Sequence, residues 1–406
     1  MSAQALSGLK IVEWGDAISG PYCAKLLGDL GAEVIKVETA GRGDRARSFG
    51  PFPGDIPHPE KSGAFLYLNT NKLGVTLNVE CATGDHIFKQ LVSEADVLIE
   101  NHAPAEIEKL DLGFEALRRV NPQLVMTSIS PFGQTGPYRD YKSCNLTSLH
   151  FSGLAYINPS DGVHDIEREP PLMGPANQGG LVAGLTAAVA TMSAVFARRI
   201  NGTAQHVDLS QYEALASVSR HQLGNYTVEQ FPWIRAKEKR SRADSDIYPC
   251  QDGLVYLICG DDRIWERWVR AMDSPEWAMS EVFQDRLLRR ENWDAAQALM
   301  REWTLERTVD EVVRRAEAAR VPCKPVNTVK ESVNSELLEA RGYFVDIWHE
   351  KTGELKYPGA PYKLSRTPWR VERPAPLLGE HNEEVYCGRL GYARHDLAVL
   401  RATGVI

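Results

Sequence analysis

The chain has 406 residues, of which 43% are hydrophobic and 25% are charged, as in ordinary globular proteins. A chain of this length is expected to form two or more domains. Its formal net charge of −8 argues against a nucleic-acid partner, because proteins that bind nucleic acids carry basic faces.

The seven cysteines show no Cys-x-x-Cys spacing. This pattern favours a reducing compartment and argues against a metal site. The first ten residues lack the basic segment and apolar run of a secretory signal. We also expect no apolar stretch that approaches the ~18 residues needed to span a bilayer. The composition therefore predicts a cytoplasmic protein with no membrane partner.

Short apolar segments alternate with helical patterns along the first 130 residues. Gly31 follows the first helical pattern, at the position where a left-handed backbone commonly ends a helix. Strands that alternate with helices are typical of a parallel, doubly wound sheet, so we predict an α/β, Rossmann-like fold. The expected strands are 10–13, 33–38, 97–99 and 124–130, and the expected helices are 22–30 and 85–95.

A later segment, 179–196, consists largely of Ala, Gly, Val and Leu. We expect a helix there, apolar on every side and therefore buried. From about residue 220 the helical patterns become rich in Arg, Glu and Trp. We predict a large domain over 1–220 and a smaller α+β domain over 221–330. The expected elements of the smaller domain are a strand at 254–259 and helices at 263–272, 293–302 and 309–319.

The segment 179–196 also carries the most informative motif. Gly180 and Gly184 open it, a basic turn with Gly202 follows it, and a strand-like segment ends at Ser210. Other short motifs occur at 20–23, 31–38, 43–47, 69–72, 95–101, 121–125, 132–138, 321–326 and 375–381. In this order and spacing the chain resembles the class III CoA-transferases, the family of the formyl-CoA and carnitine-CoA transferases.

The resemblance implies an activity. Enzymes of this family move CoA from an acyl-CoA donor to a free carboxylic acid, through a mixed anhydride with an enzyme carboxylate. Their Asp-x-x-x-Gly motif places that carboxylate at a helix N-terminus, where the helix dipole keeps it ionised. Here Gly184 matches the Gly of the motif, and Gly180 occupies the expected Asp position. Because no acid occurs from 170 to 203, we expect no catalytic residue in this chain.

The racemase branch of the family transfers protons with a His and an Asp. In the corresponding segment, Ser143 or Cys144 takes the His position and Asn145 takes the Asp position, so both groups are absent. Two alternatives stay open. One is a self-sufficient transferase whose nucleophile has moved to Glu169 or Cys144. The other is a CoA-ester-binding regulatory protein without turnover.

The resemblance also implies a site for the ADP part of CoA, at Lys72 and Lys109. Both residues are equally typical of ordinary surface lysines. Arg42, Arg45 and Arg47 follow one another within six residues. They either hold phosphates through charge-assisted hydrogen bonds or belong to a solvated loop.

The rest of the ligand site and the assembly follow from the same resemblance. Ala17, Ile18, Asn101 and His102 would line the path of the pantetheine arm. The family forms interlocked ring dimers, in which the C-terminal segment 331–406 would return to the large domain. A chain without the nucleophile is expected to be the non-catalytic subunit of a heteromer with a catalytic paralogue. Coenzyme A or succinyl-CoA would be a substrate of the complex, with no covalently bound cofactor.

Overall fold

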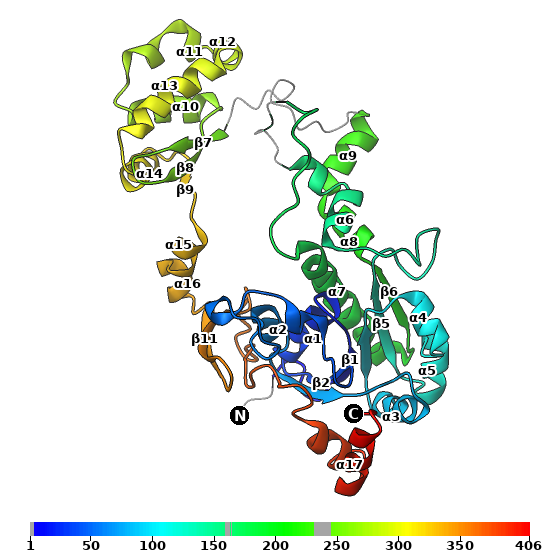
Figure 1. Ribbon diagram of the computed structural model, residues 1–406. Coiled ribbons are helices and arrows are strands. Elements are labelled where there is room, and N and C mark those ends of the chain that lie inside the picture. Colours follow the sequence, from blue (N-terminus) through cyan, green and yellow to red (C-terminus); the bar gives the residue numbers. More distant parts are fainter. Residues whose placement is uncertain (1–3, 159–162, 164, 231–244) are drawn as a thin grey trace. The chain divides into compact units, whose positions relative to one another are not determined.

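The computed structural model describes residues 4–158, 163, 165–230 and 245–406, which form two compact units (Figure 1). The large unit comprises Met1–Pro159, Pro170–Trp233 and Tyr343–Ile406, and the small unit comprises Ser160–Glu169 and Ile234–Gly342. These limits differ from the expected domain boundaries at 220 and 330. Part of the expected small domain, 231–244, lies outside the described residues.

The large unit is built on one six-stranded sheet whose strands all run parallel. The order β3-β2-β1-β4-β5-β6 is the order of the Rossmann fold. Most of these strands are buried on both faces, and therefore read as continuous apolar runs. The predicted doubly wound α/β fold is confirmed. The strands are β1 (Lys10–Trp14), β2 (Glu33–Glu38), β3 (Lys72–Thr76), β4 (Val97–Glu100), β5 (Val125–Ser130) and β6 (His206–Ser210).

Helices connect these strands and cover both faces of the sheet (Figure 1). They are α1 (Ser19–Gly28), α2 (Gly63–Leu68), α3 (Ala82–Ser93), α4 (Pro104–Lys109), α5 (Phe114–Val120), α6 (Asn145–Phe151), α7 (Gln178–Asn201), α8 (Gln211–Val218), α9 (Arg220–Glu229) and α17 (Arg394–Ala402). Alternate residues of a strand point to opposite faces. Val12 therefore shares one core with α3, α5 and α17, and Ile11 shares the other with α1 and α7.

The C-terminal segment begins with a hairpin of β10 (Phe344–His349) and β11 (Gly353–Pro358), and then covers the edge of the sheet at β3. The backbone N–H of His381 donates to the Gly74 carbonyl at 2.9 Å. The Tyr386 hydroxyl donates to the Thr76 carbonyl at 2.8 Å. These bonds occupy backbone groups that an uncovered edge strand would leave unpaired.

The small unit combines a three-stranded antiparallel sheet with helices around a tryptophan-rich core. Trp265 and Trp293 lie 6.1 Å apart, and Trp268 and Trp303 lie 5.4 Å apart, measured between ring centroids. The predicted strand and three predicted helices are present, with small shifts at their ends. The elements are β7 (Ser245–Pro249), β8 (Leu254–Ile258), β9 (Cys323–Pro325), α10 (Asp262–Ala271), α11 (Glu281–Gln284), α12 (Arg286–Glu291), α13 (Trp293–Leu305), α14 (Val309–Ala318), α15 (Val329–Val333) and α16 (Glu336–Ala340).

Helix α7, of 24 residues, buries one side and exposes the other. On the buried side the Thr191 hydroxyl lies 2.7 Å from that of Thr127 in β5. Gly184 allows α1 so close that a Cβ there would lie 2.6 Å from an α1 backbone oxygen. On the opposite side Val189 and Phe196 are 63% and 66% exposed. The expectation of burial on all sides is therefore wrong, because small residues face the sheet and larger ones face away.

Helix α7 also corrects the expectation about membrane-spanning segments. Among the described residues, α7 is the one helix that is long and apolar enough, by length and composition, to cross a bilayer. Its sequence contains no long unbroken run of strongly apolar residues, because Gly, Ala, Ser and Thr lie between them without making the helix polar. Leu185, Val189 and Phe196, which we call the outer face of α7, border an apolar cavity of about 640 Å³ together with Leu30 and Tyr362.

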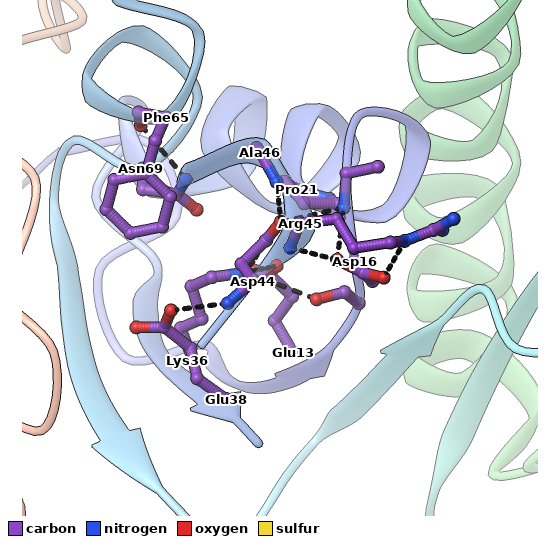
Figure 2. Close-up of polar contacts among 12 residues, drawn as sticks. Glu13, Asp16, Pro21, Lys36, Glu38, Asp44, Arg45, Ala46, Phe65 and Asn69 are labelled. Carbon is purple, nitrogen blue, oxygen red and sulfur yellow. Dashed lines mark hydrogen bonds and ion pairs between the residues drawn. The ribbon is translucent and has the colours of Figure 1, made fainter. Parts of the chain in front are cut away.

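Charged side chains from three neighbouring strands meet inside the large unit. Glu13 of β1 pairs with Lys36 of β2 at 2.8 Å and with Lys72 of β3 at 2.6 Å, and all three side chains are 0% exposed. Lys36 also pairs with Asp44 at 2.7 Å, as Figure 2 shows. Burial alone would lower the pKa of Lys36, but the carboxylates of Asp44 and Glu13 raise it, so its charge persists. We call these four residues the buried charge network.

The buried charge network ties the loops beyond the strands to the sheet. Asp44 accepts the backbone N–H of Ala17 at 2.9 Å and that of Ala46 at 2.7 Å. One carboxylate therefore holds both the loop after β1 and the short 3-10 turn at Arg45–Ser48. A second buried pair, Arg47 and Glu38 at 2.7 Å, holds the same turn. Charges taken out of water are tolerated only when they are paired, so each member depends on its partners.

We expect Glu13→Gln to lower the free energy of unfolding by about 3–5 kcal/mol, because it leaves the buried Lys72 ammonium without a carboxylate. The measurement is denaturant unfolding at neutral pH. Glu115→Gln is the matched control, since Glu115 pairs with Arg118 at 2.9 Å on the surface. The control is expected to cost less than about 1 kcal/mol. Equal losses for the two variants would contradict this account of the network.

Candidate ligand-binding site

A cavity of about 300 Å³ opens at the carboxyl ends of the central strands. Its walls come from the loops after β1, β4 and β5, from the loop before α6, and from the start of α7. In doubly wound sheets ligands bind where neighbouring strands lead in opposite directions, here between β1 and β4. The lining residues include Asp16, Ala17, Ile18, Ser19, Arg45, Asn101, Ser143, Cys144, Asn145, Asn177, Gly180 and Gln211. We call this cavity the central cavity.

Asn101 holds the loop after β1 in place. Its side-chain oxygen accepts the N–H of Asp16 at 2.7 Å, and its amide donates to the Asp16 carbonyl at 2.8 Å and to the Ser19 hydroxyl at 3.0 Å. The loop contains Ala17 at a φ of 62°, in the left-handed region that residues other than glycine rarely adopt. Such a conformation costs about 1–3 kcal/mol, and it persists because these bonds and Asp44 determine it.

Asp16 and Arg45 form the charged pair of the central cavity. Asp16 accepts the backbone N–H of Arg45 at 2.7 Å, and its other oxygen pairs with Arg45 Nε. Burial raises the pKa of Asp16, and the nearby Asp44 carboxylate adds to that rise. The Arg45 side chain is 58% exposed. Within the part of the chain that the structure describes, neither terminal nitrogen of Arg45 has a partner.

The side-chain amide of Asn145 caps α7. Its oxygen accepts the N–H of Gly179 at 2.9 Å, and its nitrogen donates to the Ala176 carbonyl at 3.0 Å. An aspartate at this position could accept the first bond but could not donate the second. The amide at 145, which differs from the acid of the racemase pattern, therefore has a structural reason in this chain.

The surroundings of Gly180 leave little room for a side chain in this chain, and its assignment to the Asp position of the family pattern stays a prediction. A Cβ on Gly180 would lie 2.9 Å from both Cβ and Cγ2 of Ile18, so a larger side chain does not fit unless the loop moves. The Asp-x-x-x-Gly spacing also fits with Gly180 as its Gly, which puts Ala176 at the Asp position, just before the helix begins at Gln178. Neither register supplies a carboxylate, and the ambiguity arises because Gly180 and Gly184 are themselves four residues apart, which is the spacing of the motif.

Three of the residues expected to contact CoA lie together, and three do not. Ala17, Ile18 and Asn101 line the central cavity. His102 does not line it; its ring packs on Trp14 with centroids 4.0 Å apart. Lys109 is exposed at the end of α4 and lines neither this cavity nor its neighbour.

The expectation that Lys72 meets the ADP part is wrong. Its ammonium is fully buried, where it pairs with Glu13 and donates to the Pro21 carbonyl and the Asn69 side-chain oxygen, each at 2.8 Å. Burial lowers the pKa of Lys72 to about 8. No local pattern reveals this burial, because a lysine that opens an apolar strand looks the same in the sequence whether its side chain is exposed or buried in an ion pair.

A second cavity of about 340 Å³ lies on the other side of the turn at Arg45–Ser48. Arg42, Arg45 and His58 line it, together with the Phe52 ring. Arg47 also borders it, but its guanidinium is buried and paired with Glu38 and with Glu60 at 2.5 Å. The three arginines therefore divide into one structural residue and two that a ligand could reach. We call this cavity the basic cavity.

Of the two alternative nucleophiles, only Cys144 lines the central cavity. Cys144 is exposed at the start of α6, and hydrogen bonds from Thr147 lower the pKa of its thiol. Glu169 belongs to the small unit, where it accepts the backbone N–H of Asp165 at 2.9 Å. Over the described ranges, no group of three or more His, Cys, Asp or Glu is placed to hold a metal ion.

Known proteins share both the sequence and the fold. Residues 6–382 match the profile of CoA-transferase family III. The chain is 31% identical over 413 residues to the β subunit of succinyl-CoA–L-malate CoA-transferase from Chloroflexus aurantiacus, covering 99% of this chain and 98% of that protein. It is 30% identical over 414 residues, with the same coverage, to succinyl-CoA:(R)-benzylsuccinate CoA-transferase subunit BbsE from Thauera aromatica. The crystal structure of a CAIB/BAIF family protein from Brucella suis matches with a TM-score of 0.83 at 27% identity, covering 99% of this chain and 100% of that one.

We expect Gly180→Ala to lower the free energy of unfolding by about 1–3 kcal/mol, because the added methyl group overpacks against Ile18. The matched control is Gly224→Ala in α9, where a Cβ would meet no atom within 4 Å. The control is expected to be neutral or to stabilise the chain by up to about 1 kcal/mol. Thermal and denaturant unfolding of both variants measure the difference. A Gly180→Ala variant as stable as the control would show that the loop at Ile18 shifts at no cost, which would contradict the tight packing described here.

Proposed function

The chain belongs to CoA-transferase family III, and from this premise we propose that it is the non-catalytic subunit of a heteromeric transferase that moves CoA from succinyl-CoA to a carboxylic acid. One observation carries the proposal. The start of α7, where the family pattern has its nucleophile, has Ala176 and Gly180 in the two possible registers and no acid from 170 to 203. The amides of Asn145 and Asn177 cannot replace a carboxylate, because forming the mixed anhydride requires an anionic oxygen.

We place CoA across the two cavities. Ala17, Ile18 and Asn101 would line the path of its pantetheine arm in the central cavity. Arg42 and His58 of the basic cavity would meet its phosphates, with the Phe52 ring nearby. Lys109 stays a candidate for the ADP part, and Lys72 does not.

An aryl-substituted succinate such as (R)-benzylsuccinate is our candidate for the acceptor. BbsE, a relative over nearly the full length, is by name a subunit of a transferase for that acid. In this chain a cluster of aromatic rings continues from the wall of the central cavity. Phe132 follows the lining residue Pro131, and Tyr212 follows the lining residue Gln211. Both rings contact the exposed ring of Phe151, at 5.8 Å and 5.3 Å between centroids.

The partner would be a catalytic paralogue, interlocked with this chain. Two relatives are, by name, subunits of CoA-transferases. The outer face of α7 is apolar and exposed, and it borders an apolar cavity of about 640 Å³. Apolar patches of this kind mark protein interfaces, so α7 is where we place the contact. All seven cysteines lie among the described residues and none of them forms a disulfide, which supports the cytoplasm as the place of action.

A second candidate function is a self-sufficient transferase that uses Cys144. It is favoured by an exposed thiol with a lowered pKa on the wall of the central cavity. In that case the thiolate would take the acyl group from the CoA thioester and CoA would leave as a thiolate.

The purified chain alone is expected to show no exchange between succinyl-CoA and (R)-benzylsuccinate, and the complex with its paralogue is expected to be active. Changing the matching aspartate of the paralogue to Ala should abolish turnover, because the complex would then hold no nucleophile. Steady-state formation of the new thioester is the measurement. An active lone chain that loses activity in Cys144→Ser would establish the second candidate instead. A complex that binds CoA esters but never turns over would indicate a regulatory protein.

We expect Val189→Glu to prevent assembly with the paralogue, because a charge on the outer face of α7 cannot be buried in an apolar contact without a large cost. Size-exclusion chromatography with light scattering measures the assembly. The matched control is Val399→Glu on α17, where the valine is similarly exposed at 59%. Assembly should survive the control, and thermal unfolding should show both variants folded. If both variants assemble normally, the partner does not use α7.

A further inference from the structure

We propose that Arg45 binds the free carboxylate at the far end of a dicarboxylic acyl group, so that the central cavity selects CoA esters of dicarboxylic acids. The inference rests on the proposed function for the presence of a CoA ester. It adds a specificity-determining residue for the succinyl group that the proposed function already names.

Arg45 is the only basic side chain among the residues that line the central cavity, all of which the structure describes. The single acid among them is Asp16, and Asn101, Ser143 and Gln211 supply neutral polar groups. An anion that enters this cavity therefore has one charged partner available. The N-terminus of α7 opens on the same cavity and adds positive potential to it.

The pairing of Arg45 fixes its orientation and leaves the binding end free. Asp16 holds the residue at two points, the backbone N–H and Nε, as Figure 2 shows. In Figure 2 the terminal nitrogens of Arg45 extend beyond the Asp16 carboxylate. The planar guanidinium can then present both terminal nitrogens to a second carboxylate, in the two-bond geometry that arginine favours. Asp16 acts here as a positioning residue.

The charge of Asp16 does not abolish the attraction between Arg45 and the carboxylate of a ligand. The buried charge network holds the loop that carries Asp16, because Asp44 accepts a hydrogen bond from the backbone N–H of Ala17 and is itself paired with Lys36. Burial and Asp44 raise the pKa of Asp16, which favours its protonated form relative to an exposed aspartate. Asp16 contacts only the backbone N–H and Nε of Arg45, so the two terminal nitrogens of the guanidinium remain available to a ligand. A carboxylate at its free edge would complete the pairing and exclude water from the cavity.

A phosphate of CoA is the competing ligand for Arg45, because this residue also lines the basic cavity with Arg42 and His58. The two possible contacts of Arg45 lead to different effects on the affinity for CoA esters. A phosphate contact would affect every CoA ester equally. A contact with the acyl carboxylate would affect only esters that carry one.

The test compares succinyl-CoA with butyryl-CoA, which has the same four-carbon acyl chain but ends in a methyl group. Calorimetric titration of the full chain is expected to show tighter binding of succinyl-CoA by about tenfold or more. Arg45→Gln should lower the affinity for succinyl-CoA to that for butyryl-CoA and leave the affinity for butyryl-CoA unchanged. Arg45→Lys should keep part of the preference, because it keeps the charge but loses the two-bond geometry. Arg42→Gln is the control, and it should change both esters by the same factor.

Equal binding of the two esters by the unaltered chain would overturn the inference and leave the proposed function standing. Equal losses of both esters in Arg45→Gln would do the same and assign Arg45 to a phosphate. Failure to bind either ester would also overturn the inference, and the exchange assay on the complex with the paralogue would then decide the proposed function separately. Thermal unfolding of Arg45→Gln should match that of the unaltered chain, since the side chain is mostly exposed.

Discussion

The carboxylate of Glu13, shared by Lys36 and Lys72 in the centre of the sheet, is the interaction on which the site depends. It joins β1, β2 and β3 through charges that have no access to water. Through Lys36 the same network reaches Asp44, which fixes the loop after β1 and the turn at Arg45–Ser48. Because an unpaired charge in this environment costs several kcal/mol, the loops cannot move without breaking the core. The fold thus provides rigid walls for both cavities.

On that scaffold the site combines neutral polar groups with a single charged pair. The side-chain amides of Asn101 and Asn145 form hydrogen bonds with the backbone, that of Asn101 in the loop after β1 and that of Asn145 at the start of α7. Asp16 orients Arg45, and the lining of the central cavity contains no other ionic side chain. Such a cavity suits the anionic ester that we propose as its ligand, and it contains no carboxylate at the start of α7. This combination fits a chain that shapes or supports a transferase site while a paralogue carries the nucleophile.

In the heteromer that we propose, the outer face of α7 would link the site to assembly. The same helix that begins at the central cavity also presents Val189 and Phe196 to the surface. A partner that covers this face would contact the helix whose N-terminus opens on the site. In the heteromer that we propose, a chain without the nucleophile would still contribute to folding and to the position of α7.

The sequence by itself determined the family, the parallel α/β fold and the absence of an acid around α7, because ordered motifs and apolar strand runs are local features of the chain. The resemblance also implied Ala17, Ile18 and Asn101, and the structure brings these three together on the wall of the central cavity, while their contact with CoA stays a prediction. Only the tertiary structure decided that Lys72 is buried in an ion pair, that α7 has an exposed side, and that Ile18 leaves no room for a side chain at Gly180. Those facts depend on which residues from distant segments become neighbours. A lysine, a small-residue helix or a glycine has the same local sequence pattern whatever packs against it, so only the tertiary packing distinguishes these cases.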